Sequence, residues 1–130
     1  MAKQFTLGKK ERLKSRKQTE LLFSEGKKFS VYPFRICYTR SRTGMAGTRF
    51  GVGVSTKLFK KAVDRNRVKR LVREAWRLQK RSFQEQLKEQ GSGMDVFFIY
   101  TSKELPLYKD VYEKTGKVLL KLSQLSAETT

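Results

Sequence analysis

The sequence predicts a mixed α/β sandwich in which one β-sheet packs against helices. Residues 32–38 and 50–54 alternate large apolar residues with other residues, the period of a strand that has one face on a core. Residues 58–89 carry apolar side chains at helical spacing, and residues 94–101 form a nearly continuous apolar run. Such a run is typical of an interior strand that is covered on both faces. The predicted order is therefore a helix, strands, a long helix, a strand and a helix.

The chain begins with a basic segment and a predicted short helix. Residues 1–14 are rich in Lys and Arg, and we expect them to be loosely ordered. Ser15 followed by Gln18 resembles a capping box, in which each side chain satisfies a free amide of the first helical turn. We expect the helix to run from about Arg16 to Glu25, with Gly26 just past its end.

Two segments read as strands. In the first, Tyr32, Phe34, Ile36 and Tyr38 share one side, and Pro33 predicts either an edge strand or an interruption. The second segment reads RFGVGVS, and its glycines at positions 51 and 53 leave one face of the strand bare. We expect another group to approach the backbone closely on that face.

The later elements are predicted from hydrophobic periodicity and from glycine and proline residues that mark the ends of helices. The long helix presents one apolar face, formed by Val68, Leu71, Val72, Ala75 and Trp76. The sequence GSG at 91–93 ends it, and a last helix begins near Pro106, weakened by Gly116. We expect one domain over residues 1–130, with a core at about 10–122 and flexible ends at 1–9 and 123–130.

Composition restricts the class of protein. The 130 residues include 30 Lys and Arg against 12 Asp and Glu, a formal net charge of +18. Such a charge opposes a compact state through self-repulsion, so a polyanionic partner is expected, and nucleic acid is the first candidate. The absence of histidine removes an imidazole acid–base group, and the single cysteine, Cys37, excludes a disulfide within one chain. No signal peptide or membrane-spanning run is recognisable, so we expect a cytoplasmic protein without a membrane partner.

The long helix carries a dense positive charge on the side away from its apolar face. Only Glu74 is acidic inside the charged arc, where it could pair with Arg70 or tune another arginine. A solvated helix face normally mixes the two signs, so a phosphate-binding face is the favoured interpretation and a merely solvated face the alternative. The planar fork of arginine matches phosphate oxygens two at a time, and Asn66 adds an acceptor that arginine lacks. The charged arc contains Arg65, Lys69, Arg70, Arg73, Arg77, Lys80 and Arg81.

Residues 62–76, AVDRNRVKRLVREAW, resemble the Arg-Asn-Arg signature of the bacterial ribonuclease P protein family. RFGVGVSTK resembles the strand that leads into the signature, RLKSRKQTELLFSEG is similar to the family's first helix, and MDVFFIYT matches its last strand. The resemblance covers roughly residues 10–122. It implies an α+β sandwich of order αβββαβα, with one mostly antiparallel sheet and a left-handed βαβ crossover around the long basic helix.

The resemblance also implies a function. In this family the protein is the RNA-binding subunit of an endoribonuclease that removes the 5′ leader from precursor tRNA, giving the mature 5′ end. The implied partners are a catalytic RNA, with one protein per RNA, and precursor tRNA, and we expect the free protein to be a monomer. The resemblance implies that the RNA and its Mg²⁺ ions carry out hydrolysis, that the protein alone binds no cofactor or metal, and that it has no catalytic residue.

Two sets of site residues follow from the resemblance by position. Phe23, Phe34, Arg35 and Lys57 are expected to hold the single-stranded leader, because aromatic stacking accepts any base and cations follow the backbone. Ordinary core packing is the alternative for Phe23 and Phe34. The residues expected to bind the catalytic RNA are Arg65, Asn66, Arg67, Lys69, Arg70 and Arg73.

Three other functions stay open on the sequence alone. A protein-only nuclease would need acids that converge on metal ions, whereas Asp64, Asp95 and Asp110 are scattered among different elements. Cys37 has no histidine to activate it, so inert strand packing is expected. A small basic ribosomal protein or a DNA-packaging protein shares the charge and length, but not the order Arg-Asn-Arg, one valine, then Lys-Arg after a glycine-bearing strand.

Overall fold

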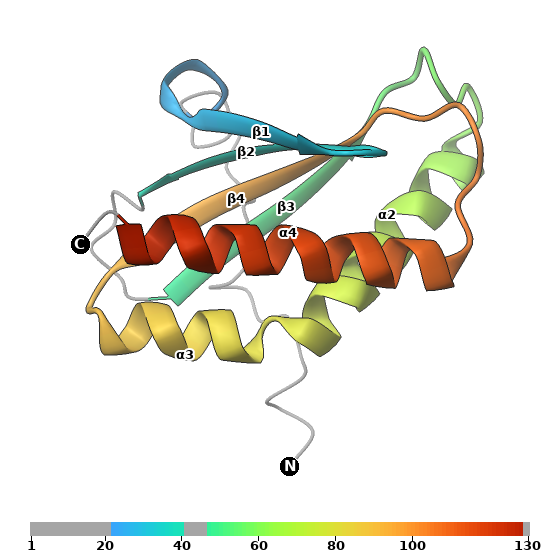
Figure 1. Ribbon diagram of the computed structural model, residues 1–130. Helices are drawn as coiled ribbons and strands as arrows, with labels where there is room; N and C mark the ends of the chain where they lie inside the picture. Colours follow the sequence, from blue (N-terminus) through green and yellow to red (C-terminus); the bar gives the residue numbers. More distant parts are fainter. Residues whose placement is uncertain (1–21, 41–46, 129–130) are drawn as a thin grey trace.

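The computed structural model describes residues 22–40 and 47–128. Residues 22–25 are helical, which confirms the end of the predicted first helix. The start of that helix, its capping pair Ser15 and Gln18, and residues 1–14 lie outside the described residues. The further elements are β1 (Lys27–Val31), β2 (Phe34–Arg40), β3 (Gly47–Val54), α2 (Ala62–Gln79), α3 (Arg81–Glu89), β4 (Gly93–Tyr100) and α4 (Tyr108–Glu128) (Figure 1).

The described strands form one sheet in the order β1-β2-β4-β3. β2 pairs antiparallel with β1 and with β4, whereas the edge strand β3 runs parallel to β4, with Gly47 opposite Gly93 and Val54 opposite Tyr100. When Figure 1 is turned so that these two strands point upward with the helices in front, β4 lies to the left of β3. The crossover through α2 and α3 is therefore left-handed, as the resemblance implies and against the general rule.

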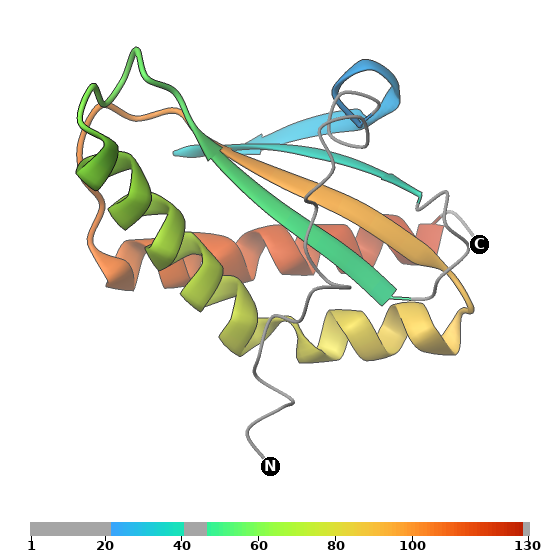
Figure 2. The ribbon, with the colours of Figure 1, turned by 180° about the vertical axis from the view of Figure 1, so that it is seen from behind.

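The helices α2, α3 and α4 cover one face of the sheet and form the core with it. Figure 2, seen from behind, shows α4 on the far side of the strands. The Phe50 ring of β3 stacks on Trp76 of α2 at 4.7 Å between centroids, and Phe98 of β4 meets both rings edge-on. Aromatic pairs of this kind contribute about 0.5–1.5 kcal/mol beyond their buried area. This cluster therefore ties α2 to the parallel pair of strands.

The predicted single helix over 58–89 is instead two helices, with the bend at Lys80. The chain does not break there, since the Lys80 amide donates to the Trp76 carbonyl and the Gln84 amide to the Lys80 carbonyl, both at 2.9 Å. The bend lets Phe83 of α3 reach the core, where its ring lies edge-on to that of Trp76. The N-terminal part of the predicted helix is also wrong, because residues 55–60 form turns that bury Phe59.

Two other details revise the predicted elements. Pro33 lies in the turn that joins β1 to β2, so of the two interpretations the interruption is confirmed. Residues 123–128, which were predicted to belong to a flexible end, are helical and continue α4. Side chains of α3 hold this part of α4: Gln86 Nε2 donates to the Ser123 carbonyl at 3.0 Å, and the Ser126 hydroxyl donates to Gln90 Oε1 at 2.8 Å.

Candidate nucleic-acid interface

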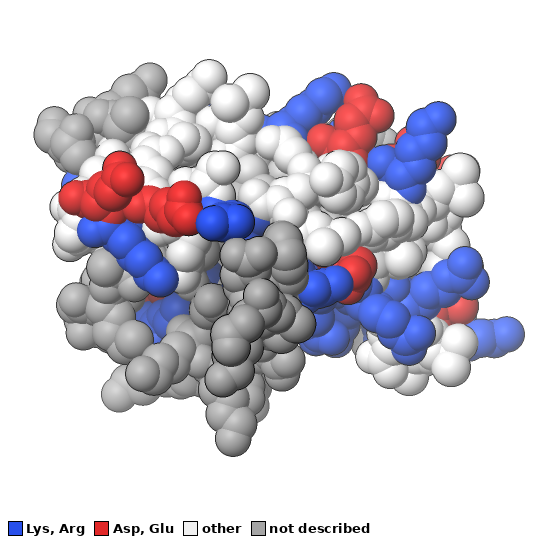
Figure 3. Space-filling model, turned by 90° about the horizontal axis from the view of Figure 1, so that it is seen from below, with Lys and Arg blue, Asp and Glu red and all other residues white. Residues whose placement is uncertain are grey.

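The outer side of α2 presents the densest positive charge of the predicted site. Val68, Val72, Ala75 and Trp76 are buried against the sheet and α4, which leaves the opposite side of the helix in solvent. Figure 3 shows Lys and Arg side chains gathered over the part of the molecule where α2 lies, with few acidic side chains among them. The exposed residues on this side include Asn66, Arg67, Arg70 and Arg73, and Lys69 is half-buried beside them.

These cations have no acid to neutralise them within the described part of the chain. Arg49, Arg77, Arg81 and Lys117 are among the residues that form ion pairs there, whereas Arg67, Lys69, Arg70 and Arg73 form none with a described residue. A row of like charges at helical spacing is locally unfavourable, by about 0.2–0.5 kcal/mol for each i,i+4 pair. A bound phosphate removes this repulsion, so the face is electrostatically suited to a polyanion.

Arg65 differs from the other predicted RNA-binding residues. Its side chain is half-buried, and Nη1 donates to the carbonyl oxygens of Phe59 and Lys60, both at 2.8 Å. The guanidinium therefore ties the turn before α2 to the first turn of that helix. Arg65 shapes the N-terminal end of the charged face, and the exposed Lys60 and Lys61 extend that end into the turn. Neither lysine was among the predicted site residues.

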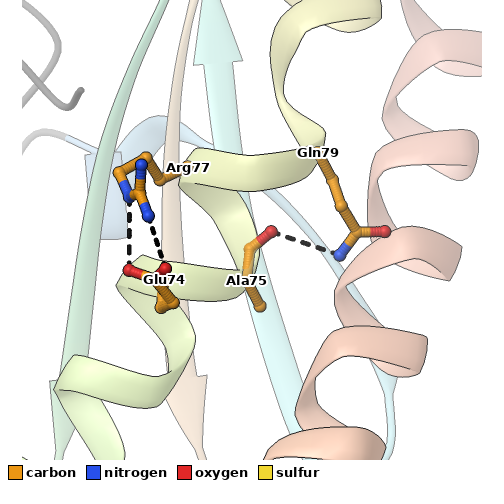
Figure 4. Close-up of polar contacts among 4 residues, drawn as sticks. All are labelled: Glu74, Ala75, Arg77 and Gln79. Carbon is orange, nitrogen blue, oxygen red and sulfur yellow. Dashed lines mark hydrogen bonds and ion pairs between the residues drawn. The ribbon is translucent and has the colours of Figure 1, made fainter. Parts of the chain in front are cut away.

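Glu74 pairs with Arg77, not with Arg70. Arg77 Nε donates to Glu74 Oε2 at 3.2 Å, and Arg77 Nη2 donates to Glu74 Oε1, so the carboxylate holds the guanidinium by two bonds (Figure 4). Glu74 raises the pKa of the Arg77 guanidinium above its usual value, chiefly by accepting its hydrogen bonds. Figure 4 also shows that Gln79 points away from this pair and toward α4.

The sheet face opposite the three helices carries a second set of predicted residues. Phe23, 38% exposed, lies edge-on to the Phe97 ring of β4 with 5.1 Å between centroids. Arg35 is exposed on β2, opposite Ile99 of β4, and Cys37 lies opposite Phe97. Phe23, Arg35, Cys37, Phe97 and Ile99 define what we call the open face.

Phe34 does not belong to the open face, so its assignment to the leader site is corrected. The side chain is 1% exposed and lies in the core, with ring centroids 5.4 Å from Phe98 and 5.7 Å from Tyr100. Neighbouring strand residues point to opposite faces, so the exposure of Arg35 and the burial of Phe34 have one cause. Lys57 is exposed in the turn after β3.

A sequence profile of the ribonuclease P family, described as Ribonuclease P, matches residues 7–123. The chain belongs to the ribonuclease P protein family. It is 41% identical over 120 residues to the ribonuclease P protein component of Porphyromonas gingivalis, which covers 92% of this chain and 88% of that relative. It is also 32% identical over 123 residues to the corresponding component of Syntrophus aciditrophicus, which covers 94% and 95%.

Solved structures support the same family. The ribonuclease P protein from Thermotoga maritima is 30% identical, with a TM-score of 0.65 over 85% of this chain and 96% of that one. A Staphylococcus aureus ribonuclease P protein, at 20% identity, has a TM-score of 0.65 over 87% and 94% and supports the fold alone. The role of a ribonuclease P protein subunit is therefore favoured over that of a small ribosomal protein.

Phe97 is a residue of the open face that sequence reasoning did not select. It lies in the run VFFIY, where every residue is apolar and no alternation marks which side chains face the core. The expected close approach to the β3 backbone also involves Phe97, since a Cβ built on Gly53 would lie 3.0 Å from its ring. Only the pairing of β3 with β4 places these two residues side by side.

The acids of this family member do not assemble into a metal site within residues 22–40 and 47–128. No cluster of three or more Cys, Asp or Glu side chains that could hold a metal ion occurs there. Asp95 is engaged by Arg49, whose Nε and Nη2 donate to its two carboxylate oxygens at 2.8 and 2.7 Å. In the same described ranges, none of the helices combines the length and apolar character needed to cross a membrane.

Proposed function

We propose that this ribonuclease P protein binds the catalytic RNA of the enzyme through the outer side of α2, and so assists removal of the 5′ leader from precursor tRNA. The observation that carries the proposal is the set of exposed arginines on α2, which have no acidic partner among the described residues. The contact set consists of Asn66, Arg67, Lys69, Arg70 and Arg73, with Arg65 shaping its N-terminal end.

Hydrolysis is assigned to the RNA partner and its Mg²⁺ ions, and the protein assists by neutralising phosphates. Asp64, Asp95 and Asp110 belong to α2, β4 and α4, and Asp95 is already bound by Arg49. Within residues 22–40 and 47–128, no group of three or more Cys, Asp or Glu is placed to hold a metal ion, so nothing there supports two-metal chemistry by the protein. In this proposal the protein therefore has no catalytic residue. We also propose that one copy of the protein binds each RNA and that the complex works in the cytoplasm.

The open face is the proposed site for the 5′ leader of precursor tRNA. Phe23 and the half-buried Phe97 offer a partly exposed aromatic pair, and Arg35 adds a cation two residues before Cys37 on the same strand face. Stacking of a base on an aromatic ring contributes about 1–3 kcal/mol without requiring a particular base. Binding of the leader here makes precursor tRNA bind more tightly than mature tRNA, from which the leader has been removed.

The first experiment measures cleavage of a precursor tRNA by the ribonuclease P RNA of the same organism at low Mg²⁺, with and without the protein. We expect cleavage at the mature 5′ end to depend on the protein under these conditions. If the protein binds RNA but does not increase cleavage of the precursor tRNA, the proposed role is contradicted.

Two variants separate the two surfaces. Arg70→Ala should weaken assembly with the catalytic RNA, whereas Lys88→Ala, an exposed change on α3, is its matched control. Phe23→Ala should narrow the preference for precursor over mature tRNA and leave assembly with the RNA intact. Equal effects of Arg70→Ala and Lys88→Ala would remove α2 from the interface.

A further inference from the structure

The ion pair between Glu74 and Arg77 sits at one end of the charged face of α2. Arg70, Arg73 and Arg77 follow the spacing i, i+3 and i+7, so they lie along one line of the helix. Arg77 would extend the row of arginines by one turn if it were available to RNA. Its side chain is 30% exposed, and that of Glu74 is 45% exposed, so both groups are partly accessible to solvent.

Glu74 occupies Arg77 in the way a phosphate would. The carboxylate accepts hydrogen bonds from Nε and from Nη2, which is the two-bond geometry that an arginine offers to phosphate oxygens. A phosphate that approached these two N–H groups would have to displace Glu74, whose own negative charge repels it. Arg67, Arg70 and Arg73 have no such carboxylate among the described residues.

We propose that Glu74 is a specificity-determining residue, which withholds Arg77 from RNA and thereby ends the RNA-binding face at Arg73. The inference rests on the proposed function, because it refines which part of α2 meets RNA. Phosphate contacts carry little sequence information and support binding to any RNA. An additional arginine in contact with RNA would therefore favour binding of unrelated RNA as much as binding of the proper partner. The carboxylate limits that non-specific binding and fixes where the RNA docks along the helix.

The test uses Glu74→Gln in the full-length protein, with Glu113→Gln as the matched control. Glu113 pairs with Lys117 on α4, so its replacement also removes one negative charge from beside a cation, but away from the line of arginines. Binding is measured over 50 to 200 mM salt for two RNAs, the ribonuclease P RNA and an unrelated RNA duplex. Thermal melts of each variant establish that it is folded.

We expect Glu74→Gln to steepen the salt dependence on the duplex by about 0.9, the slope of one additional phosphate contact. Over that fourfold range of salt, the loss of affinity then grows by a further factor of about 3.5. The ratio of the affinity for ribonuclease P RNA to the affinity for the unrelated duplex should decrease. Glu113→Gln should leave the slope close to that of the wild type, and the double variant Glu74→Gln, Arg77→Ala should restore it.

Three outcomes would overturn the inference: equal slopes for Glu74→Gln and Glu113→Gln, a steeper slope that persists in the double variant, or a shallower slope for Arg77→Ala alone. The last would mean that Arg77 already binds phosphate in the wild type. An Arg70→Ala arm in the same assay tests the proposed function by itself. If that variant binds ribonuclease P RNA unchanged, the assignment of α2 as the interface fails whatever Glu74→Gln does.

Discussion

Phe34 and Arg35 are adjacent in the sequence and lie on opposite faces of the sheet. Alternation along the strand already placed Phe34 with Ile36 and Tyr38, apart from Arg35. What alternation could not supply is which face the helices cover, because that depends on how distant segments pack. The structure settles it through the contacts of Phe34 with the rings of Phe98 and Tyr100.

Substitutions of Phe23 and Phe34 should therefore have different effects. Phe34→Ala should lower the free energy of unfolding by about 3–5 kcal/mol, because it leaves a cavity among packed rings. Phe23→Ala should destabilise the protein less, since its ring is partly exposed. Urea denaturation of both variants measures the difference. A loss for Phe23→Ala as large as that for Phe34→Ala would mean that Phe23 is a core residue.

Cys37 should behave as an inert thiol in the native protein. It is 1% exposed, and burial raises the pKa of its thiol, while the nearby charges of Lys28 and Arg35 lower it by less. The thiolate is the reactive form, so the raised pKa slows modification of Cys37, and the low exposure of the side chain slows it further. We expect a disulfide reagent at pH 7.5 to label Cys37 rapidly in urea and slowly without it. Immediate labelling of the native protein would contradict this burial.

At the scale of the element, the bend between α2 and α3 was the main feature that the sequence did not reveal. No proline or glycine marks position 80, and the apolar spacing continues through it. Gly116, in contrast, is visible in the sequence as a weak point of the last helix, but the side chain that requires a glycine there belongs to α2. A Cβ built on Gly116 would lie 2.8 Å from Gln79 Oε1, so the glycine makes room for that side chain.

Gln79 and Gly116 should be energetically coupled across the contact between α2 and α4. Gln79 Nε2 donates to the Tyr112 carbonyl of α4 at 2.9 Å. Alanine is better than glycine within a helix by about 1 kcal/mol. Gly116→Ala should nevertheless be nearly neutral, because the new methyl group displaces Gln79 and weakens a hydrogen bond that contributes a similar amount, about 0.5–1.5 kcal/mol.

A double-mutant cycle measures this coupling. In a Gln79→Ala background the methyl group meets no amide, so Gly116→Ala should stabilise the protein by the full amount of about 1 kcal/mol. Denaturant unfolding of the four proteins gives the coupling energy. Identical effects of Gly116→Ala in the two backgrounds would show that the glycine is not there for Gln79.

At the scale of the whole molecule, the sequence predicted the layers but not the arrangement within them. Periodicity identified the strand segments and the long basic helix, and charge identified the outer side of α2 as the candidate interface. The left-handed crossover came from family resemblance and the order of the strands within the sheet was not predicted, because local spacing carries no information on either. The position of Phe97 beside Phe23 depends on that topology, which explains why the open face was only partly predicted.

The distribution of charge over the whole molecule predicts that anions stabilise the fold. A net charge of +18 opposes compaction, and the folded chain gathers several unpaired arginines on α2 that an unfolded chain would disperse. A ligand that binds only the folded state stabilises it by about 2.7 kcal/mol at 100 times its dissociation constant. We expect millimolar pyrophosphate to raise the melting temperature more than sodium chloride of equal ionic strength. The combined change Arg67→Ala, Arg70→Ala should reduce that difference, and an undiminished difference would place the stabilising site away from α2.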